Sequence, residues 1–319
     1  MAQHILGIDI AKDKFDVALR LGPQIVTEQF ANSTTGFHLL RQWWLELGVT
    51  QVHACLEATG TYGMALALFL HQQGQCVSVV NPLRIKGYAQ AQLKRHKTDQ
   101  ADARLIADFC HTQKPALWTP PSAQVEYLQA LTRRIEALQG MLQAERNRLA
   151  VAPSAAQPSV ARIIATLQEE IHRLETEVQT YIDDDPDLQE QSRLLQSIPG
   201  IGAKTAHLLL SEIEFARYEN ARQVAAHAGL TPKQEQSGTS VKHSKLSKLG
   251  NGRIRKALYF PAVSAKRHNA PLREFAQRLA QSGKTTMQII CAVMRKLLHQ
   301  AYGILKHRIP FDAQLAFSA

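Results

Sequence analysis

The first 115 residues alternate between short apolar runs and stretches with helical spacing. Apolar or alternating runs predict five strands, at 5–10, 14–20, 24–30, 52–56 and 76–80. Apolar residues that recur every three or four positions predict helices at 34–47, 62–73 and 98–111. The order is three strands followed by helix, strand, helix, strand and helix. It predicts an α/β domain whose mixed sheet is covered by helices on both faces.

A different pattern follows a proline-bounded linker at 115–121. Two long segments carry apolar residues in steps of three and four, with a proline-containing break at 153–158 between them: Leu128, Leu131, Ile135, Leu138, Leu142 and Leu149, then Val160, Ile163, Leu167, Ile171, Leu174, Val178 and Tyr181. This spacing predicts an antiparallel coiled-coil hairpin over 121–190. The stripes pack on each other or on a second subunit. Dimerisation is favoured, because a two-helix hairpin alone has little core.

Positive charge is concentrated in the last third of the chain. The 319 residues include 37 Lys+Arg and 27 Asp+Glu, for a net charge of +10. Segment 231–308 holds 16 Lys+Arg but only the acids Glu235 and Glu274, a local net charge of +14. A dense basic segment on a mildly acidic body predicts a surface that binds polyanions. Nucleic acid is favoured over a merely solvated face or a membrane surface.

Composition excludes several other classes of protein. A hydrophobic content of 45% supports globular cores, in about two domains by length. No apolar run approaches the roughly 18 residues of a membrane span, and no secretion signal is expected at the N-terminus. The cysteines are widely spaced, which indicates a reducing cytoplasm rather than disulfides or a zinc ribbon: Cys55, Cys76, Cys110 and Cys291.

Four carboxylates stand at positions where a metal site could form. Asp9 ends the first predicted strand and Glu57 follows the fourth. Asp99 and Asp102 lie about one turn apart at the start of a predicted helix, on one face. Convergent acids raise each other's pKa unless cations neutralise them, and paired Mg²⁺ ions also suit phosphoryl chemistry.

Each acid alone is better explained as a cap or a helix-dipole partner. All four, in the order found in ribonuclease H-like domains and on a basic chain, favour a metal site. Gly7-Ile8-Asp9 also resembles the first phosphate loop of actin-like kinases. That class is disfavoured, because the sequence contains neither a second glycine-rich phosphate loop nor an adenosine loop.

Segment 197–206 has the pattern of a helix-hairpin-helix motif. Gly200 and Gly202 let a phosphate approach the backbone at the start of a helix, and Lys204 adds a cation. A purely structural helix turn is the alternative. Ser237-Gly238 then precedes a basic run containing Lys242, Lys245, Lys248, Arg253, Arg255 and Lys256. From composition alone, a phosphate-binding loop is favoured there over a catalytic serine.

Several motifs together are specific. They are Ile8-Asp9 with Lys12, Glu57-Ala58-Thr59-Gly60-Thr61-Tyr62, Asn81-Pro82, Lys97-Thr98-Asp99 with Asp102-Ala103-Arg104, Ile198-Pro199-Gly200-Ile201-Gly202, and Gly229-Leu230-Thr231-Pro232 followed by Ser237-Gly238. With them, nearly the whole chain closely resembles the DEDD transposases of the insertion sequence one-ten family. The resemblance implies a RuvC-like (ribonuclease H fold) catalytic domain at 1–120, a dimerising coiled-coil hairpin at 121–190 and a mostly helical transposase domain at 191–319.

The resemblance also implies a mechanism for a mobile-element recombinase. Asp9, Glu57, Asp99 and Asp102 would bind Mg²⁺, with Mn²⁺ as a substitute, and Ser237 would form a covalent phosphoserine with cleaved DNA. Ser240 is the alternative nucleophile. A structured bridge RNA would pair with donor and target DNA, and dimers would assemble into a tetramer in the bacterial cytoplasm, at the nucleoid when active.

Phosphate contacts are expected from Lys97, from Arg104 and from the lysine and arginine side chains that follow Ser237. Two rival functions remain. A RuvC-like endonuclease or junction resolvase would use water as the nucleophile, and a non-catalytic nucleic-acid-binding protein would need no tetrad.

Overall fold

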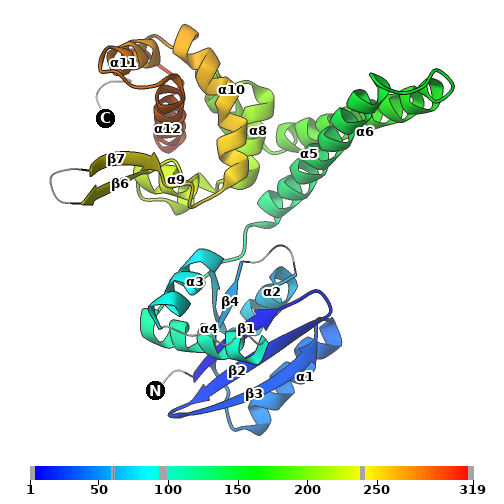
Figure 1. Cartoon of the computed structure of the whole chain (residues 1–319), viewed down its shortest axis with the longest axis vertical. Helices are drawn as coiled ribbons and strands as arrows, with labels where there is room; N and C mark the ends of the chain where they lie inside the picture. The colour runs from blue at the N-terminus through cyan, green and yellow to red at the C-terminus, as the bar shows by residue number, and fades with distance from the viewer. Residues whose placement is uncertain (1–3, 59, 61, 93–98, 238–240, 315–319) are drawn as a thin grey trace. The chain divides into compact units, whose positions relative to one another are not determined.

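The computed structural model describes residues 4–58, 60, 62–92, 99–237 and 241–314, with backbone alone at 233–237 and 241–245 (Figure 1). The chain divides into two compact units, Met1–Pro120 and Pro121–Ala319. Each unit has its own hydrophobic core and is considered separately below.

A five-stranded mixed sheet forms the centre of the first unit, as the sequence predicts. Its strand order is β3-β2-β1-β4-β5. The strands are β1 (His4–Ile10), β2 (Lys14–Leu21), β3 (Gln24–Ala31), β4 (Val52–Glu57) and β5 (Cys76–Val80). The first three form an antiparallel meander, while β4 pairs parallel to β1 and β5 parallel to β4. The carboxyl ends of β1, β4 and β5 therefore meet at one edge of the sheet.

Helices cover both faces of this sheet, and they are α1 (Thr34–Glu46), α2 (Met64–Gln72), α3 (Pro82–Ala91) and α4 (Asp99–Gln113). Leu6 and Ile8 point to the face that packs with α1 and α2. Ile5 points to the opposite face, where it packs with Ile106 of α4. This alternation is the two-residue period of a strand buried on both sides.

The helix α3 was not among the predicted elements. Asn81 caps its first turn by accepting a hydrogen bond from the Leu83 N–H, and Pro82 occupies the first helical position. Only Ile85 is fully buried, with Tyr88 and Ala89 packed beside it, so the apolar stripe is a single turn long and too short to stand out in the sequence.

In the second unit, α5 (Ala123–Leu149) and α6 (Gln157–Asp183) form the predicted helical hairpin. Their apolar stripes pack on each other in two clusters. Leu128 contributes to one cluster, with Val178, and Leu138 to the other, with Leu174. Ile163, near the tip, remains 49% exposed.

The remainder of the unit is helical apart from one hairpin of strands. Its elements are α7 (Pro186–Gln196), α8 (Ala203–Glu212), η1 (Phe215–Arg217), α9 (Ala221–His227), β6 (Pro232–Ser237), β7 (Val241–Leu246), α10 (Gly252–His268), α11 (Ala270–Gln281) and α12 (Thr286–His307). The long apolar face of α12 contributes much of the core. Within the described ranges, no helix is long and apolar enough to cross a bilayer.

Candidate active site

Asp9 and Glu57 end neighbouring parallel strands. The register pairs Ile8 of β1 with Leu56 of β4, so Asp9 and Glu57 are the next residues along the two strands. Residues in register on adjacent strands share a face of the sheet. Both acids therefore belong to the face that packs against α4, as the sequence analysis required.

The helix α4 brings two further acids to Asp9. It can lie close to β1 because Gly7 has no side chain, and a Cβ there would come within 2.2 Å of the Ala103 carbonyl oxygen. Asp99 and Asp102 stand in the first turn of this helix. Burial, followed by the negative charges of Asp102 and Asp99, raises the pKa of Asp9 to about 6. Asp99 and Asp102 therefore lie within electrostatic range of Asp9, whereas Glu57 is not among the main groups that raise this pKa.

A fifth acid, Asp16, was missed by the sequence analysis. It pairs directly with Asp9 across the β1–β2 ladder, is only 2% exposed and adds to the rise in the pKa of Asp9. Gln29 donates to both of its carboxylate oxygens at 3.1 Å. Lys14 lies 3.1 Å from Asp99 and 3.8 Å from Asp16. The sequence feature that could have revealed Asp16 is the short β1–β2 connection, because its length sets the register that places Asp16 opposite Asp9.

The side chains of Asp9, Glu57, Asp99 and Asp102 offer carboxylate oxygens, which are the ligands that a hard divalent cation prefers. Such an ion would also relieve the repulsion between the carboxylates. The carboxylates are not gathered into a closed cage, however. Among the residues whose placement is described, no group of three Asp, Glu, His or Cys side chains has the geometry to hold a metal ion. The roles of Asp9, Glu57, Asp99 and Asp102 as ligands remain predictions.

Ser237 lies in the second unit, as the last residue of β6. Its backbone pairs with Val241 at the start of β7, so it stands at the tip of a two-stranded hairpin rather than in a plain loop. Lys242 and Lys245 lie on β7. Ser240 and Lys97, both named as candidates, fall outside the described residues.

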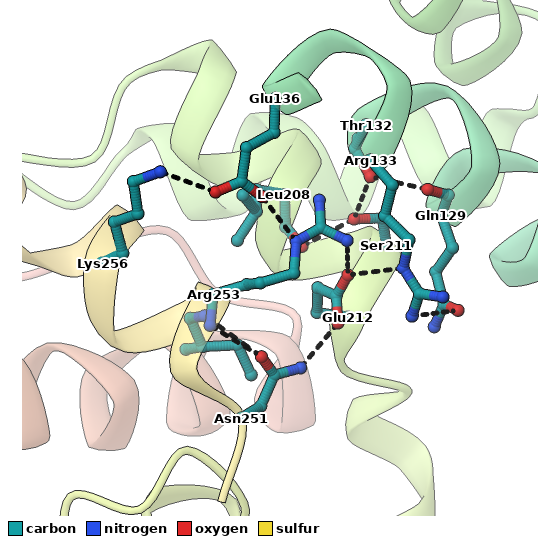
Figure 2. Close-up of polar contacts among 11 residues, drawn as sticks. Gln129, Thr132, Arg133, Glu136, Leu208, Ser211, Glu212, Asn251, Arg253 and Lys256 are labelled. Carbon is teal, nitrogen blue, oxygen red and sulfur yellow. Dashed lines mark hydrogen bonds and ion pairs between the residues drawn. The ribbon is translucent and has the colours of Figure 1, made fainter. Parts of the chain in front are cut away.

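The basic residues that open α10 have protein partners (Figure 2). Arg253 donates to Glu136 of α5 at 2.8 Å and to Glu212 of α8 at 2.7 Å. Lys256 pairs with Glu136 at 2.7 Å, and this hydrogen bond is the main cause of a lowered pKa at Glu136. Arg255 donates to backbone carbonyls, including that of Ala228 at 2.8 Å. Arg253 and Lys256 are therefore neutralised in part within the unit.

The remaining predicted phosphate contacts are dispersed. Gly202 caps α8 and its Cβ position is open, whereas Gly200 packs tightly on α10, with a φ of +109°. Lys204 pairs with Glu175 at 2.6 Å. Arg104 on α4 and Lys248 after β7 are exposed. Phosphate binding by these residues is untested.

Known transposase families match both parts of the chain. A profile of DEDD transposases of the IS110 type matches residues 6–152, and one described as "Transposase IS116/IS110/IS902 family" matches residues 192–277. A pilin gene-inverting protein of Moraxella bovis is 35% identical over 99% of both chains. The transposase of insertion element IS1328 of Yersinia enterocolitica is 25% identical over 94% of this chain and 96% of its own.

A transposase of element IS1111A of Coxiella burnetii is 25% identical over 83% of this chain and 78% of its own. Family membership implies cleavage and rejoining of DNA, and it suggests dependence on a divalent metal. The similarity to the Moraxella protein spans the whole chain. The chain therefore belongs to the IS110 family of DNA transposases.

Proposed function

We propose that residues 1–120 are a RuvC-like catalytic domain in which Asp9, Glu57, Asp99 and Asp102 hold Mg²⁺, with Mn²⁺ as a substitute. The observation that carries this proposal is structural: Asp9 and Glu57 are in register on parallel strands, and Gly7 lets α4, which bears Asp99 and Asp102, pack closely on β1. The raised pKa of Asp9, caused by its burial and by the two acids of α4, supports it. Such an arrangement is unfavourable in the protein alone and becomes favourable when a cation is bound. Mg²⁺ would neutralise the phosphodiester and orient its oxygens.

Other side chains around the acidic tetrad would support its role. Asp16, buried and held by Gln29, would add negative charge beside Asp9. Lys14, beside Asp99, restrains that carboxylate until a cation replaces the contact. Arg104 on α4 would contact the DNA backbone, and so would Lys97, which falls outside the described residues.

Ser237 would perform the covalent step in the transposase domain at 191–319. Its hydroxyl oxygen bonds to phosphorus while one ester bond of the phosphodiester breaks. The serine proton goes to the departing oxygen, which leaves as a free sugar hydroxyl. In the reverse reaction, the hydroxyl of another strand displaces the serine and restores it.

A covalent-adduct assay with nicked DNA tests this step. Wild-type protein should form a denaturation-resistant protein–DNA adduct with Mg²⁺, and Ser237→Ala should not. Ser240→Ala is the matched control and should retain the adduct. Cleavage by Ser237→Ala without an adduct would instead identify a water-using resolvase. Full recombination by Asp102→Asn would contradict the acidic tetrad.

The proposed partners are donor DNA, target DNA and a structured bridge RNA, with the hairpin at 121–190 forming dimers that assemble into a tetramer. The basic charge of segment 231–308 supports contacts to both kinds of nucleic acid. Sequencing of copurified RNA tests the first part, and light scattering with and without nucleic acid tests the second. RNA unrelated to the flanks of the gene, or a stable monomer throughout, would contradict them.

Inversion of a DNA segment is a second candidate outcome of the same chemistry. It is favoured by the match over 99% of both chains to a protein named for gene inversion. A plasmid carrying two recombination sites distinguishes the outcomes. Inverted sites would yield a reversed segment, whereas an enzyme restricted to insertion would leave the orientation unchanged.

A further inference from the structure

A large groove lies within the second unit, along α11 and α12. Its volume is about 1960 Å³, well above the roughly 300–1,000 Å³ of a small-molecule pocket. We call it the α12 groove. Its occupant is therefore larger than a single small ligand.

Cations line this groove. Six of them come from α9, the segment after β7, and α12 with its preceding turn: Arg222, Lys248, Lys284, Arg295, Lys296 and Lys306. Among the described lining residues the only acid is Asp312. Burial, followed by the charges of Arg295 and Lys296, lowers the pKa of His299 to about 4. The groove therefore has a strongly positive potential that suits a polyanion.

Apolar side chains form the rest of the lining. Met287 is 55% exposed and Ile309 52% exposed. Phe275 and Phe311 are half-buried along it, and the Lys296 ammonium stands 5.9 Å from the centre of the Phe275 ring. Double-stranded DNA presents phosphates and keeps its base faces stacked inside. A single strand offers both phosphates and unstacked base faces.

The groove also adjoins the proposed nucleophile's hairpin. Pro232, which begins β6, and Leu246, which ends β7, both line it. The hairpin whose first strand carries Ser237 therefore starts and ends at the edge of the groove. Strand exchange separates a cleaved strand from its complement, and such a strand would be released at this hairpin.

We propose that the α12 groove binds single-stranded DNA, with bases against Phe275 and Met287 and phosphates along the cations of α12. This inference rests on the proposed function in one respect: strand exchange is the step that would supply the single-stranded DNA. Binding itself needs neither the serine nor the acidic tetrad. A protein that does not bind single-stranded DNA in the groove can thus be distinguished from one that does not form a phosphoserine.

Native Cys291 provides the first test, because it lines the groove and is partly exposed. The full-length protein would carry Ser237→Ala, to prevent cleavage, and Cys76→Ser, to remove the other partly exposed thiol. Maleimide labelling of Cys291 should slow on addition of oligothymidylate and remain fast with a blunt duplex of equal length. Equal protection by the duplex, or none by the single strand, would overturn the proposal.

Charge variants give the second test. Arg295→Gln with Lys296→Gln should lower the salt dependence of oligothymidylate binding by roughly 1.4 in log–log slope, about 0.7 for each lost phosphate contact. The control pair, Arg267→Gln with Arg273→Gln, removes two exposed charges outside the groove and should leave the slope unchanged. An equal decrease in slope for both pairs would show that binding depends on general surface charge rather than on the groove, and would overturn the proposal.

The apolar contribution can be tested with two exposed methionines. Met287→Gln should weaken oligothymidylate binding about fivefold, the effect of roughly one lost apolar contact. Met141→Gln, on α5 and 51% exposed, should not change it. If Cys291 instead becomes protected with rising protein concentration and no DNA, the occupant is a second copy of the chain and the proposal is wrong. Stronger protection by single-stranded RNA than by DNA would also refute it.

Discussion

At the scale of single residues, Gly7 determines whether the candidate site can form. It is the point at which α4 crosses β1, and a Cβ would lie 2.2 Å from the Ala103 oxygen and 2.3 Å from the Ala107 nitrogen. Both atoms belong to the helix backbone and cannot move aside as a flexible side chain would. Gly7 therefore holds the acids of α4 within electrostatic range of Asp9.

Gly7→Ala should lower the stability of the first unit by about 2 kcal/mol or more, as expected for overpacking against backbone. Thermal unfolding of the 1–120 fragment measures this loss. Gly87→Ala on α3 is the control, because its Cβ position is open and alanine favours a helix. An equal melting temperature for Gly7→Ala and wild type would contradict the close approach.

Asp9→Asn should stabilise the metal-free protein at neutral pH. The folded state holds the pKa of Asp9 near 6, above its ordinary 3.8, so ionisation of Asp9 opposes folding. The penalty is absent below about pH 3.8, grows between the two values and is complete above pH 6. The melting-temperature advantage of the variant in chelator should therefore rise between pH 4 and pH 7 and level off above it.

Asp13→Asn, in the exposed β1–β2 turn, is the matched control and should show no such trend. Added Mg²⁺ should raise the melting temperature of wild type more than that of Asp9→Asn. If Mg²⁺ stabilises both proteins equally, Asp9 is not a ligand, whatever the activity of the variant.

At the scale of elements, Arg253 joins three helices. It lies at the start of α10 and bonds to Glu136 of α5 and Glu212 of α8 (Figure 2). The Glu212 side chain is only 3% exposed, and Asn251 also donates to it, at 2.6 Å. This contact links the middle of α5 to α10, the helix that follows the β6–β7 hairpin.

Glu212→Gln should destabilise the second unit by about 2–3 kcal/mol, somewhat below the 3–5 kcal/mol of a fully buried ion pair, because Arg253 is 22% exposed. Glu190→Gln breaks an exposed pair with Arg193 and should cost at most about 0.5 kcal/mol. Urea unfolding of both variants measures the difference. Similar losses in the two would show that Arg253 makes no special brace.

Elements with a strong apolar period were predictable, and those without one were not. The strand at Cys76–Val80 and both long helices follow from periodicity. The hairpin β6–β7 was expected as a loop, because Lys233-Gln234-Glu235-Gln236 alternates no apolar residues. Asp16 was missed for a different reason: it stands inside a predicted strand, and only the register set by the short β1–β2 turn makes it a neighbour of Asp9.

At the scale of the whole molecule, the two units differ in charge. Residues 1–120 contain 11 Lys+Arg and 9 Asp+Glu, a net charge of +2, while residues 121–319 contain 26 and 18, a net charge of +8. The unit with the acidic cluster is thus nearly neutral overall. We therefore expect the unit that carries Ser237 and the α12 groove to supply most of the long-range attraction for nucleic acid.

Separate expression of the two units tests this division of labour. Each has its own core, so fragments 1–120 and 121–319 should both fold. Non-specific DNA binding should remain with fragment 121–319 and weaken steeply with salt, because it depends on release of counterions from the phosphates. Fragment 1–120 should bind DNA weakly at any salt concentration, yet retain the Mg²⁺-induced rise in melting temperature. Strong, salt-sensitive DNA binding by fragment 1–120 would place the main electrostatic contact at the acidic cluster, where like-charge repulsion without a cation argues against it.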